Sequence, residues 1–132
     1  MSERVTVFYD RDCGFCRWSL GLLLAWDRHR RLRPAPIQSP EGDAALGHLP
    51  QEKRLASAHA RLPDGRVLSG GHAFEPIARL LPAGAPLAAL AHRAPGAAVR
   101  GYRAVADRRT TFGPRLPRSW VAAGDRRIAS RS

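Results

Sequence analysis

Two cysteines three positions apart, in the stretch FYDRDCGFCR, are the residues of this chain best suited to redox chemistry. Cys13 and Cys16 are the only cysteines among its 132 residues. A Cys-x-x-Cys pair at the start of a helix places both sulfurs on one side of the first turn, where they can form and release a disulfide. The helix N-terminus stabilises a thiolate on the first cysteine. We therefore predict thiol–disulfide exchange with Cys13 as the attacking thiol and Cys16 as the resolving thiol.

Charged residues flank this pair and affect its reactivity in opposite directions. Arg11 and Arg17 should lower the thiol pKa, because a nearby positive charge favours the thiolate. Asp10 and Asp12 should raise it for the opposite reason, so the sequence leaves the reduction potential open. A carboxylate could also shuttle the proton of the resolving thiol, and Asp10 is therefore the third candidate catalytic residue.

Two alternatives to a redox pair were weighed, a metal site and simple packing. A zinc site usually needs four ligands, and the chain has no second Cys-x-x-Cys. The histidines are scattered, and each is interpreted as a surface or loop residue: His29, His48, His59, His72 and His92. The cysteines could instead pack as small apolar residues, but a close-spaced pair between a strand and a helix is typical of redox sites. We expect neither a metal nor a bound cofactor.

The residues on either side of the pair predict the elements that position it. Residues 4–9 combine β-branched and aromatic types in a run too short for a typical helix, which predicts a strand. From about Gly14 to Arg28 apolar residues recur at three- and four-residue spacing, which predicts a helix that begins at the cysteines. Asp12 is its expected N-cap, because an aspartate side chain accepts hydrogen bonds from the first amides of a helix.

A second strand, Leu32–Ile37, should lie at the edge of the sheet. Its prolines at positions 34 and 36 would place both missing N–H groups on the same side of the strand, which a sheet tolerates only at an unpaired edge. The elements that follow are a weak helix, two strands around a turn at residues 63–65, and a helix: Pro40 to about Leu49, Ala56–Leu62, Arg66–Ser69, and His72 to about Leu81. Further helices are expected near Leu87–Arg93 and Ala97–Arg108.

Length and composition indicate one globular domain. A chain of this length, with 44% hydrophobic and 25% charged residues, can bury a core without a structural disulfide. The N-terminal residues MSERVTVFYD lack the basic start and apolar centre of a secretory signal. The longest apolar run, Leu20–Trp26, is too short to cross a bilayer. We therefore expect a cytoplasmic protein without a transmembrane segment.

The formal charge of +11 is carried almost entirely by arginine, since only one of the 22 basic residues is a lysine. Such a charge attracts phosphates. The arginines are dispersed, however, and no nucleic-acid module or aromatic platform accompanies them, so nucleic acid is not an expected partner. The alternative to an enzyme is a non-catalytic binding or redox-sensing module whose basic surface holds an acidic partner. The oligomeric state is left open.

The segment Tyr9-Asp10-x-x-Cys13-x-x-Cys16 resembles the signature of the DCC family of predicted thiol-disulfide oxidoreductases. Two further motifs agree more weakly: Asp64-Gly65-x-x-x-x-Gly70-x-x-Ala73 and Tyr102-Arg103-x-x-Ala106-x-x-Arg109. With them the resemblance covers roughly residues 4–110. The resemblance implies a thioredoxin-like fold and marks Asp10, Cys13 and Cys16 as the defining site. It gives a structural role to the residues of the middle motif.

The expected architecture is α/β and thioredoxin-like, with a central mixed sheet of about four strands flanked by helices and a helical, basic C-terminal extension. The domain should span residues 1–110. Residues 111–132 should form a basic tail that is loosely ordered unless Phe112, Leu116 and Trp120 dock on the body. The expected function is that of a thiol-disulfide oxidoreductase, acting on a thiol- or disulfide-containing protein or small molecule.

Overall fold

The computed structural model describes residues 4–131, apart from the side chains at positions 109, 110, 112 and 113. A mixed sheet in the order β2-β1-β3-β4 forms its centre. The strands are β1 (Val5–Tyr9), β2 (Leu32–Pro36), β3 (His59–Arg61) and β4 (Val67–Ser69). The helices are α1 (Gly14–Trp26), α2 (Pro40–Leu46), α3 (Gln51–Ala56), α4 (Phe74–Leu80), α5 (Ala85–Arg93), α6 (Pro95–Phe112) and α7 (Arg118–Ala129), with short 3₁₀ turns η1 (Gly70–Ala73) and η2 (Gly113–Arg115).

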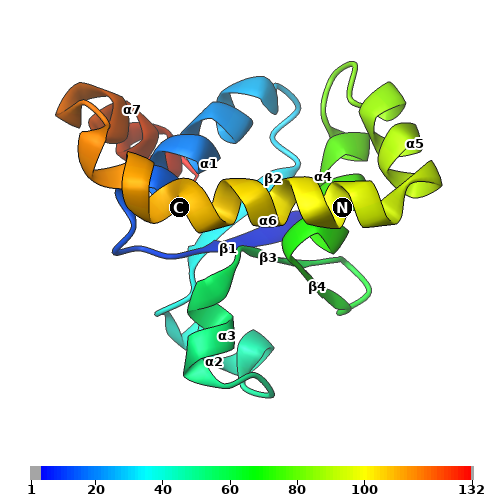
Figure 1. The fold of residues 1–132 in the computed structure, drawn as a ribbon, viewed down its shortest axis with the longest axis horizontal. Coiled ribbons are helices and arrows are strands. Elements are labelled where there is room, and N and C mark those ends of the chain that lie inside the picture. The colour runs from blue at the N-terminus through cyan, green and yellow to red at the C-terminus, as the bar shows by residue number, and fades with distance from the viewer. Residues whose placement is uncertain (1–3, 132) are drawn as a thin grey trace.

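Strand β1 separates two apolar clusters because its side chains alternate between the faces of the sheet. Val5, Val7 and Tyr9 belong to the larger cluster, together with residues of α1, α4 and α7. Phe8 points the other way and packs with residues of β2, α2 and α3. Figure 1 shows the same division, with α1 and α7 on one side of the sheet and α2 and α3 on the other. The strand that leads into the cysteines is therefore fixed from both sides.

The prolines of β2 lie where the sequence places them, at the edge of the sheet. Strand β2 pairs in parallel with β1, and Pro34 lies opposite Val7 while Pro36 lies opposite Tyr9. The tight turn between β3 and β4 is confirmed as well: these strands are antiparallel. Gly65 supplies the positive φ of 92° that this turn requires.

The strand order and the alternation of strands and helices are those of a thioredoxin-like fold, as expected. Strands β1 and β2 are parallel neighbours, and β1 also pairs with the antiparallel β3. One helix was not predicted. Helix α3 covers residues 51–56, so the following strand begins at His59 and not at Ala56.

The C-terminal segment differs from a loosely ordered tail, because residues 118–129 form the packed helix α7. Ile128 belongs to the larger core cluster. Trp120 is one of the residues expected to order this segment if they docked on the body of the domain. It stacks on Trp18 of α1 with ring centroids 5.8 Å apart. Phe112, another of them, lies outside the side chains that the structure describes. The expectation of a helical C-terminal extension is confirmed.

Small residues bring α1 and α7 into backbone contact. A Cβ atom added to Gly21 would lie 2.4 Å from the Cα of Gly124, and one added to Gly124 would lie 2.5 Å from the carbonyl oxygen of Arg17. Neither position can therefore accept a side chain without moving the helices apart. This contact fixes α7 directly against the helix that begins at the cysteines.

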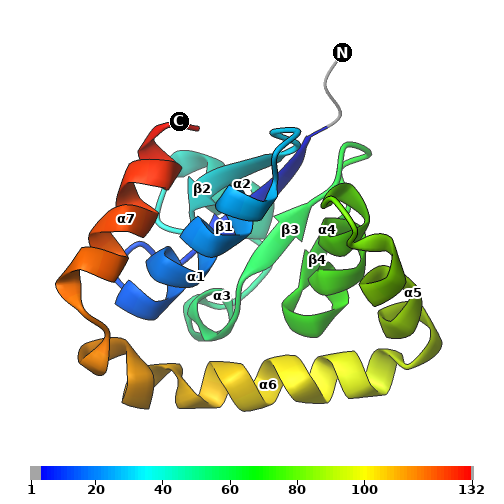
Figure 2. The ribbon, with the colours of Figure 1, turned by 90° about the horizontal axis from the view of Figure 1, so that it is seen from above.

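Helix α6 bridges the two sides of the molecule. Figure 2 shows it running along one end of the fold, from α5 to the segment that leads into α7. It approaches η1 closely, since a Cβ on Gly71 would lie 2.5 Å from the Cα of Val99. Within residues 4–131 no helix is both long enough and apolar enough to cross a membrane.

Candidate redox site

Cys13 is the N-cap of α1, and its sulfur closes the first turn of the helix. Its Sγ accepts a hydrogen bond from the backbone N–H of Cys16 at 3.3 Å. The prediction of Asp12 as N-cap is wrong by one position. The N–H of Asp12 instead donates to Asp10 Oδ1 at 3.0 Å, in a loop that turns before the helix begins. The cap is therefore itself one of the two cysteines.

Asp10 organises the loop that leads into Cys13. Its backbone carbonyl accepts a hydrogen bond from the N–H of Cys13 at 3.2 Å. Its carboxylate Oδ1 also accepts one from Gln38 Nε2 at 2.7 Å, which ties the loop to the end of β2. The side-chain carbonyl of Gln38 in turn accepts the N–H of Arg11 at 3.1 Å. Sequence reasoning did not find Gln38, because a glutamine 28 residues away carries no local signal.

The guanidinium of Arg17 contacts both α7 and the loop before α1. Its Nε lies 3.2 Å from Asp125 Oδ1 on α7, and its Nη1 donates to the carbonyl of Arg11 at 3.1 Å. Asp125 also acts on a neighbouring phenol: burial, and then this carboxylate, raises the pKa of Tyr9, while Arg11 and Arg17 oppose the shift. Tyr9 therefore stays protonated beside the cysteine pair at neutral pH.

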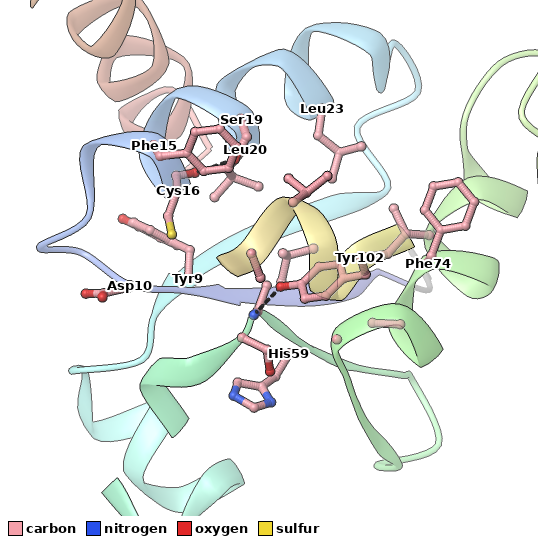
Figure 3. A pocket seen from close by; sticks show the side chains of 18 of the residues that line it. Tyr9, Asp10, Phe15, Cys16, Ser19, Leu20, Leu23, His59, Phe74 and Tyr102 are labelled. Carbon is pink, nitrogen blue, oxygen red and sulfur yellow. Dashed lines mark hydrogen bonds between the residues drawn. The ribbon is translucent and has the colours of Figure 1, made fainter. Parts of the chain in front are cut away.

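A cavity of about 420 Å³ lies next to Cys16. It is enclosed by β1, α1, the start of β3, the turn η1 with α4, and α6. Figure 3 shows the sulfur of Cys16 on the same wall as Tyr9 and Phe15, with Leu23 and Phe74 farther along the cavity. Asp10 also lines it. The cavity therefore joins two of the three predicted site residues, Cys16 and Asp10.

Tyr102 of α6 reaches across to the sheet and closes part of this cavity. Its hydroxyl accepts a hydrogen bond from the N–H of Ala58 at 2.7 Å, as the dashed line in Figure 3 shows. Ala58 directly precedes β3. The residue was noted only for its place in a family motif, since nothing in the sequence indicates that α6 crosses this end of the sheet.

His59 is almost fully buried, with 1% of its surface exposed, and its imidazole lies on the face of the sheet opposite the cavity, as Figure 3 shows. Its Nε2 lies 2.9 Å from the carbonyl oxygen of Arg54, and its Nδ1 lies 2.6 Å from Ser69 Oγ. A neutral imidazole satisfies both partners, because Nε2–H donates to the carbonyl while Nδ1 accepts from the hydroxyl. The prediction of His59 as a surface or loop residue is therefore wrong: it is a core residue of β3.

Burial lowers the pKa of His59, against a smaller opposing effect of the hydrogen bond to the Arg54 carbonyl. The folded protein thus takes up this proton less readily than the unfolded chain, whose histidine pKa is about 6.5. We predict that the stabilisation is complete above this value and that the free energy of unfolding falls as the pH drops below it. Denaturant titrations at pH 7.5 and 5.5 measure the loss, which should be smaller in His59→Gln. An equal loss in both proteins would contradict the assignment.

Within the described part of the chain no three His, Cys, Asp or Glu side chains gather in an arrangement able to hold a metal ion.

Comparison with known families bears on the same residues. A family model described as DCC1-like thiol-disulfide oxidoreductase matches residues 7–115. Comparisons with curated proteins and with solved structures give no match. The matched region covers most of the chain and runs from β1 through both cysteines to the end of η2. The chain therefore belongs to the DCC1-like thiol-disulfide oxidoreductase family.

Proposed function

We propose that this protein catalyses thiol–disulfide exchange, with Cys13 as the attacking thiol and Cys16 as the resolving thiol. The family supports a redox function. The observation that carries the assignment of roles is the hydrogen bond from the N–H of Cys16 to Cys13 Sγ. A sulfur that caps a helix accepts an amide hydrogen bond and meets the positive end of the helix dipole, and both favour its thiolate.

The proposed reaction begins with the dithiol protein and a substrate disulfide. The Cys13 thiolate attacks one substrate sulfur, so a bond forms between protein and substrate while the substrate disulfide breaks and releases one thiolate. Cys16 then loses its proton and attacks Cys13 Sγ, which releases the second substrate thiol and leaves a Cys13–Cys16 disulfide. Two electrons pass from the protein to the substrate. A dithiol reductant is needed to return the protein to its starting state.

Asp10 is proposed as the proton relay for Cys16. It lines the same cavity as Cys16, and the hydrogen bonds from Asp12 and Gln38 both reach its Oδ1. We assign the proton exchange to Oδ2. The hydrogen bond from Gln38 holds the carboxylate in place. A group that transfers a proton during a short-lived intermediate needs such a fixed position.

The test of this proposal is the pKa of the Cys13 thiol, measured in Cys16→Ser from the pH dependence of alkylation. We expect an inflection clearly below the ordinary thiol value of about 8.5. Cys13→Ser, in which Cys16 is the remaining thiol, is the matched control and should titrate at a higher pH. An inflection for Cys13 at or above the ordinary value would contradict its assignment as the attacking thiol.

A further inference from the structure

We propose that the cavity beside Cys16 binds an uncharged, apolar small-molecule disulfide, and that this is the substrate class of the exchange reaction. The inference rests on the proposed function and adds a substrate class to it. It depends on three features of the cavity: the chemistry of its walls, the charge of its lining and the nature of its mouth.

The walls are apolar on every side. Val7 of β1, Leu20 and Leu23 of α1, and Ile77 and Leu81 of α4 all line the cavity. A volume of about 420 Å³ lies in the range of sites that hold organic ligands. Apolar walls contribute binding free energy roughly in proportion to the apolar ligand area that they remove from water. A ligand of matching character is therefore favoured.

Two polar side chains of the lining already have partners within the protein. Ser19 Oγ donates to the carbonyl of Cys16 at 3.2 Å. The hydroxyl of Tyr102 accepts the N–H of Ala58. Binding a strongly polar ligand would break these contacts or leave the ligand's own groups without partners, and both cost free energy.

The charge of the lining is opposite to that of the whole protein. Although the chain carries a formal charge of +11, no arginine or lysine is among the lining residues that the structure describes, whereas Asp10 is. Among the described residues the cavity therefore offers no cation to pair with an anionic disulfide, and it has a carboxylate that repels one. The cavity therefore favours an uncharged disulfide, whereas the overall positive charge of the protein attracts an anionic one.

The mouth of the cavity is apolar as well. Trp26, Phe74 and Val105 line it and remain exposed, at 38%, 42% and 54% of their surfaces. The indole N–H of Trp26 donates to the carbonyl of Pro82 at 2.8 Å, so the ring presents its carbon atoms to an incoming ligand. Large exposed apolar side chains grouped around an opening are a mark of a binding site.

A small molecule fits this site better than an extended peptide does. A peptide that pairs with the sheet needs backbone donors and acceptors from its host. The N–H of Ala58, which precedes β3 at the cavity, already donates to Tyr102. In the proposed complex the apolar group of the substrate occupies the cavity and its disulfide lies at the cysteine pair. The two exchange steps then follow as described above.

The inference is tested with two chromogenic aromatic disulfides that differ in charge. Dithiodipyridine is aromatic and uncharged, whereas dithiobis(nitrobenzoate) is aromatic and doubly negative. Single-turnover rates with the dithiol protein are divided by the rates of a small-molecule dithiol, which removes the intrinsic reactivity of each probe. We expect a normalised preference of about tenfold or more for the uncharged probe, even though the net charge of the protein attracts the anionic one.

Matched variants connect this preference to the cavity. Ala106→Leu adds volume to the lining and should reduce the preference. Ala104→Leu makes the same change at an exposed position of α6 outside the lining and should leave the preference intact. Val105→Arg places a cation at the mouth, on an exposed residue whose replacement does not threaten folding, and should shift the preference toward the anionic probe.

Binding of the neutral fluorophore N-phenylnaphthylamine to the Cys13→Ser/Cys16→Ser variant reports on the cavity without any exchange chemistry. Weaker binding in the same background carrying Ala106→Leu supports the site. Equal normalised rates for the two disulfides, or an effect of Ala104→Leu as large as that of Ala106→Leu, would overturn the substrate class while leaving the proposed function intact. If neither disulfide is reduced, the proposed function fails and the substrate class fails with it.

Discussion

Replacing Cys13 with serine should lower the rate at which this protein reduces a disulfide substrate to the uncatalysed background rate. The serine hydroxyl can accept the same capping hydrogen bond from Cys16, so α1 should form as before. What the variant lacks is the sulfur that forms the mixed disulfide. A coupled assay of disulfide reduction, with circular dichroism to confirm the fold, measures the effect.

Cys16→Ser separates the two steps of the same reaction. Attack by Cys13 remains possible, but nothing within the protein resolves the mixed disulfide. We expect release of one substrate thiol per protein, followed by a stop that an added dithiol relieves. If the rate is indifferent to both replacements, the chain acts instead as a binding module, and salt-dependent binding of an acidic partner becomes the property to measure.

The buried ion pair between Asp27 and Arg131 should carry the second large effect, on stability. Asp27 is fully buried and follows α1, and its Oδ2 lies 2.8 Å from Arg131 Nη1 at the end of the chain. The same carboxylate accepts the backbone N–H groups of Arg31 and Leu32. The guanidinium also donates to the carbonyl oxygens of Leu24, Asp27 and Leu32. One contact thus connects α1, β2 and the end of α7.

Removing either partner of this pair leaves the other buried without a counter-charge. Arg131→Ala or Asp27→Ala should each lower the free energy of unfolding by about 3–5 kcal/mol. The double variant should lose much less than the sum of the two, because neither charge is then left alone. Denaturant titration measures these values. Arg127→Ala, at an exposed arginine of α7, is the matched control and should change stability by about 0.5 kcal/mol or less. Additive losses would show that the two residues act independently.

The sheet and the first helix could be predicted from the sequence because their signals are local. The alternation of Val5, Val7 and Tyr9 follows the two-residue period of a strand. The prolines at positions 34 and 36 exclude a central strand, and β2 lies at the edge. The apolar spacing after Gly14 marks the helix that begins at the cysteines. In each case one physical rule acts on neighbouring residues.

The close packing of helix α7 on α1 was not predicted, because it depends on small residues. Gly124 lies against Gly21, and such a contact leaves little of the large apolar periodicity from which a packed helix is usually recognised. Ile128 is the residue of α7 in the core cluster, and the ion pair of Arg131 joins positions 104 residues apart. From its own sequence alone, a basic segment with few large apolar residues resembles a solvated tail, because the contacts that order it are with α1.

The placement of the two cysteines at the start of α1 was predicted, whereas their surroundings were not. Cys13 and Cys16 lie one turn apart at the start of α1, as their spacing requires. The cavity depends on α6 crossing the end of the sheet, and that path is fixed by the close approach of Gly71 to Val99 and by the Tyr102 hydrogen bond. Such contacts between distant segments leave no periodic pattern. The local rules therefore predict the thiols but not the cavity.

The most direct test of the central claim is mass analysis of the dithiol protein after reaction with one equivalent of an uncharged disulfide and rapid alkylation. The account predicts an internal Cys13–Cys16 disulfide, with no alkylated cysteine and with both halves of the substrate released as thiols. A protein that keeps two alkylatable thiols, or one that carries a stable substrate adduct beside one alkylated cysteine, would contradict it.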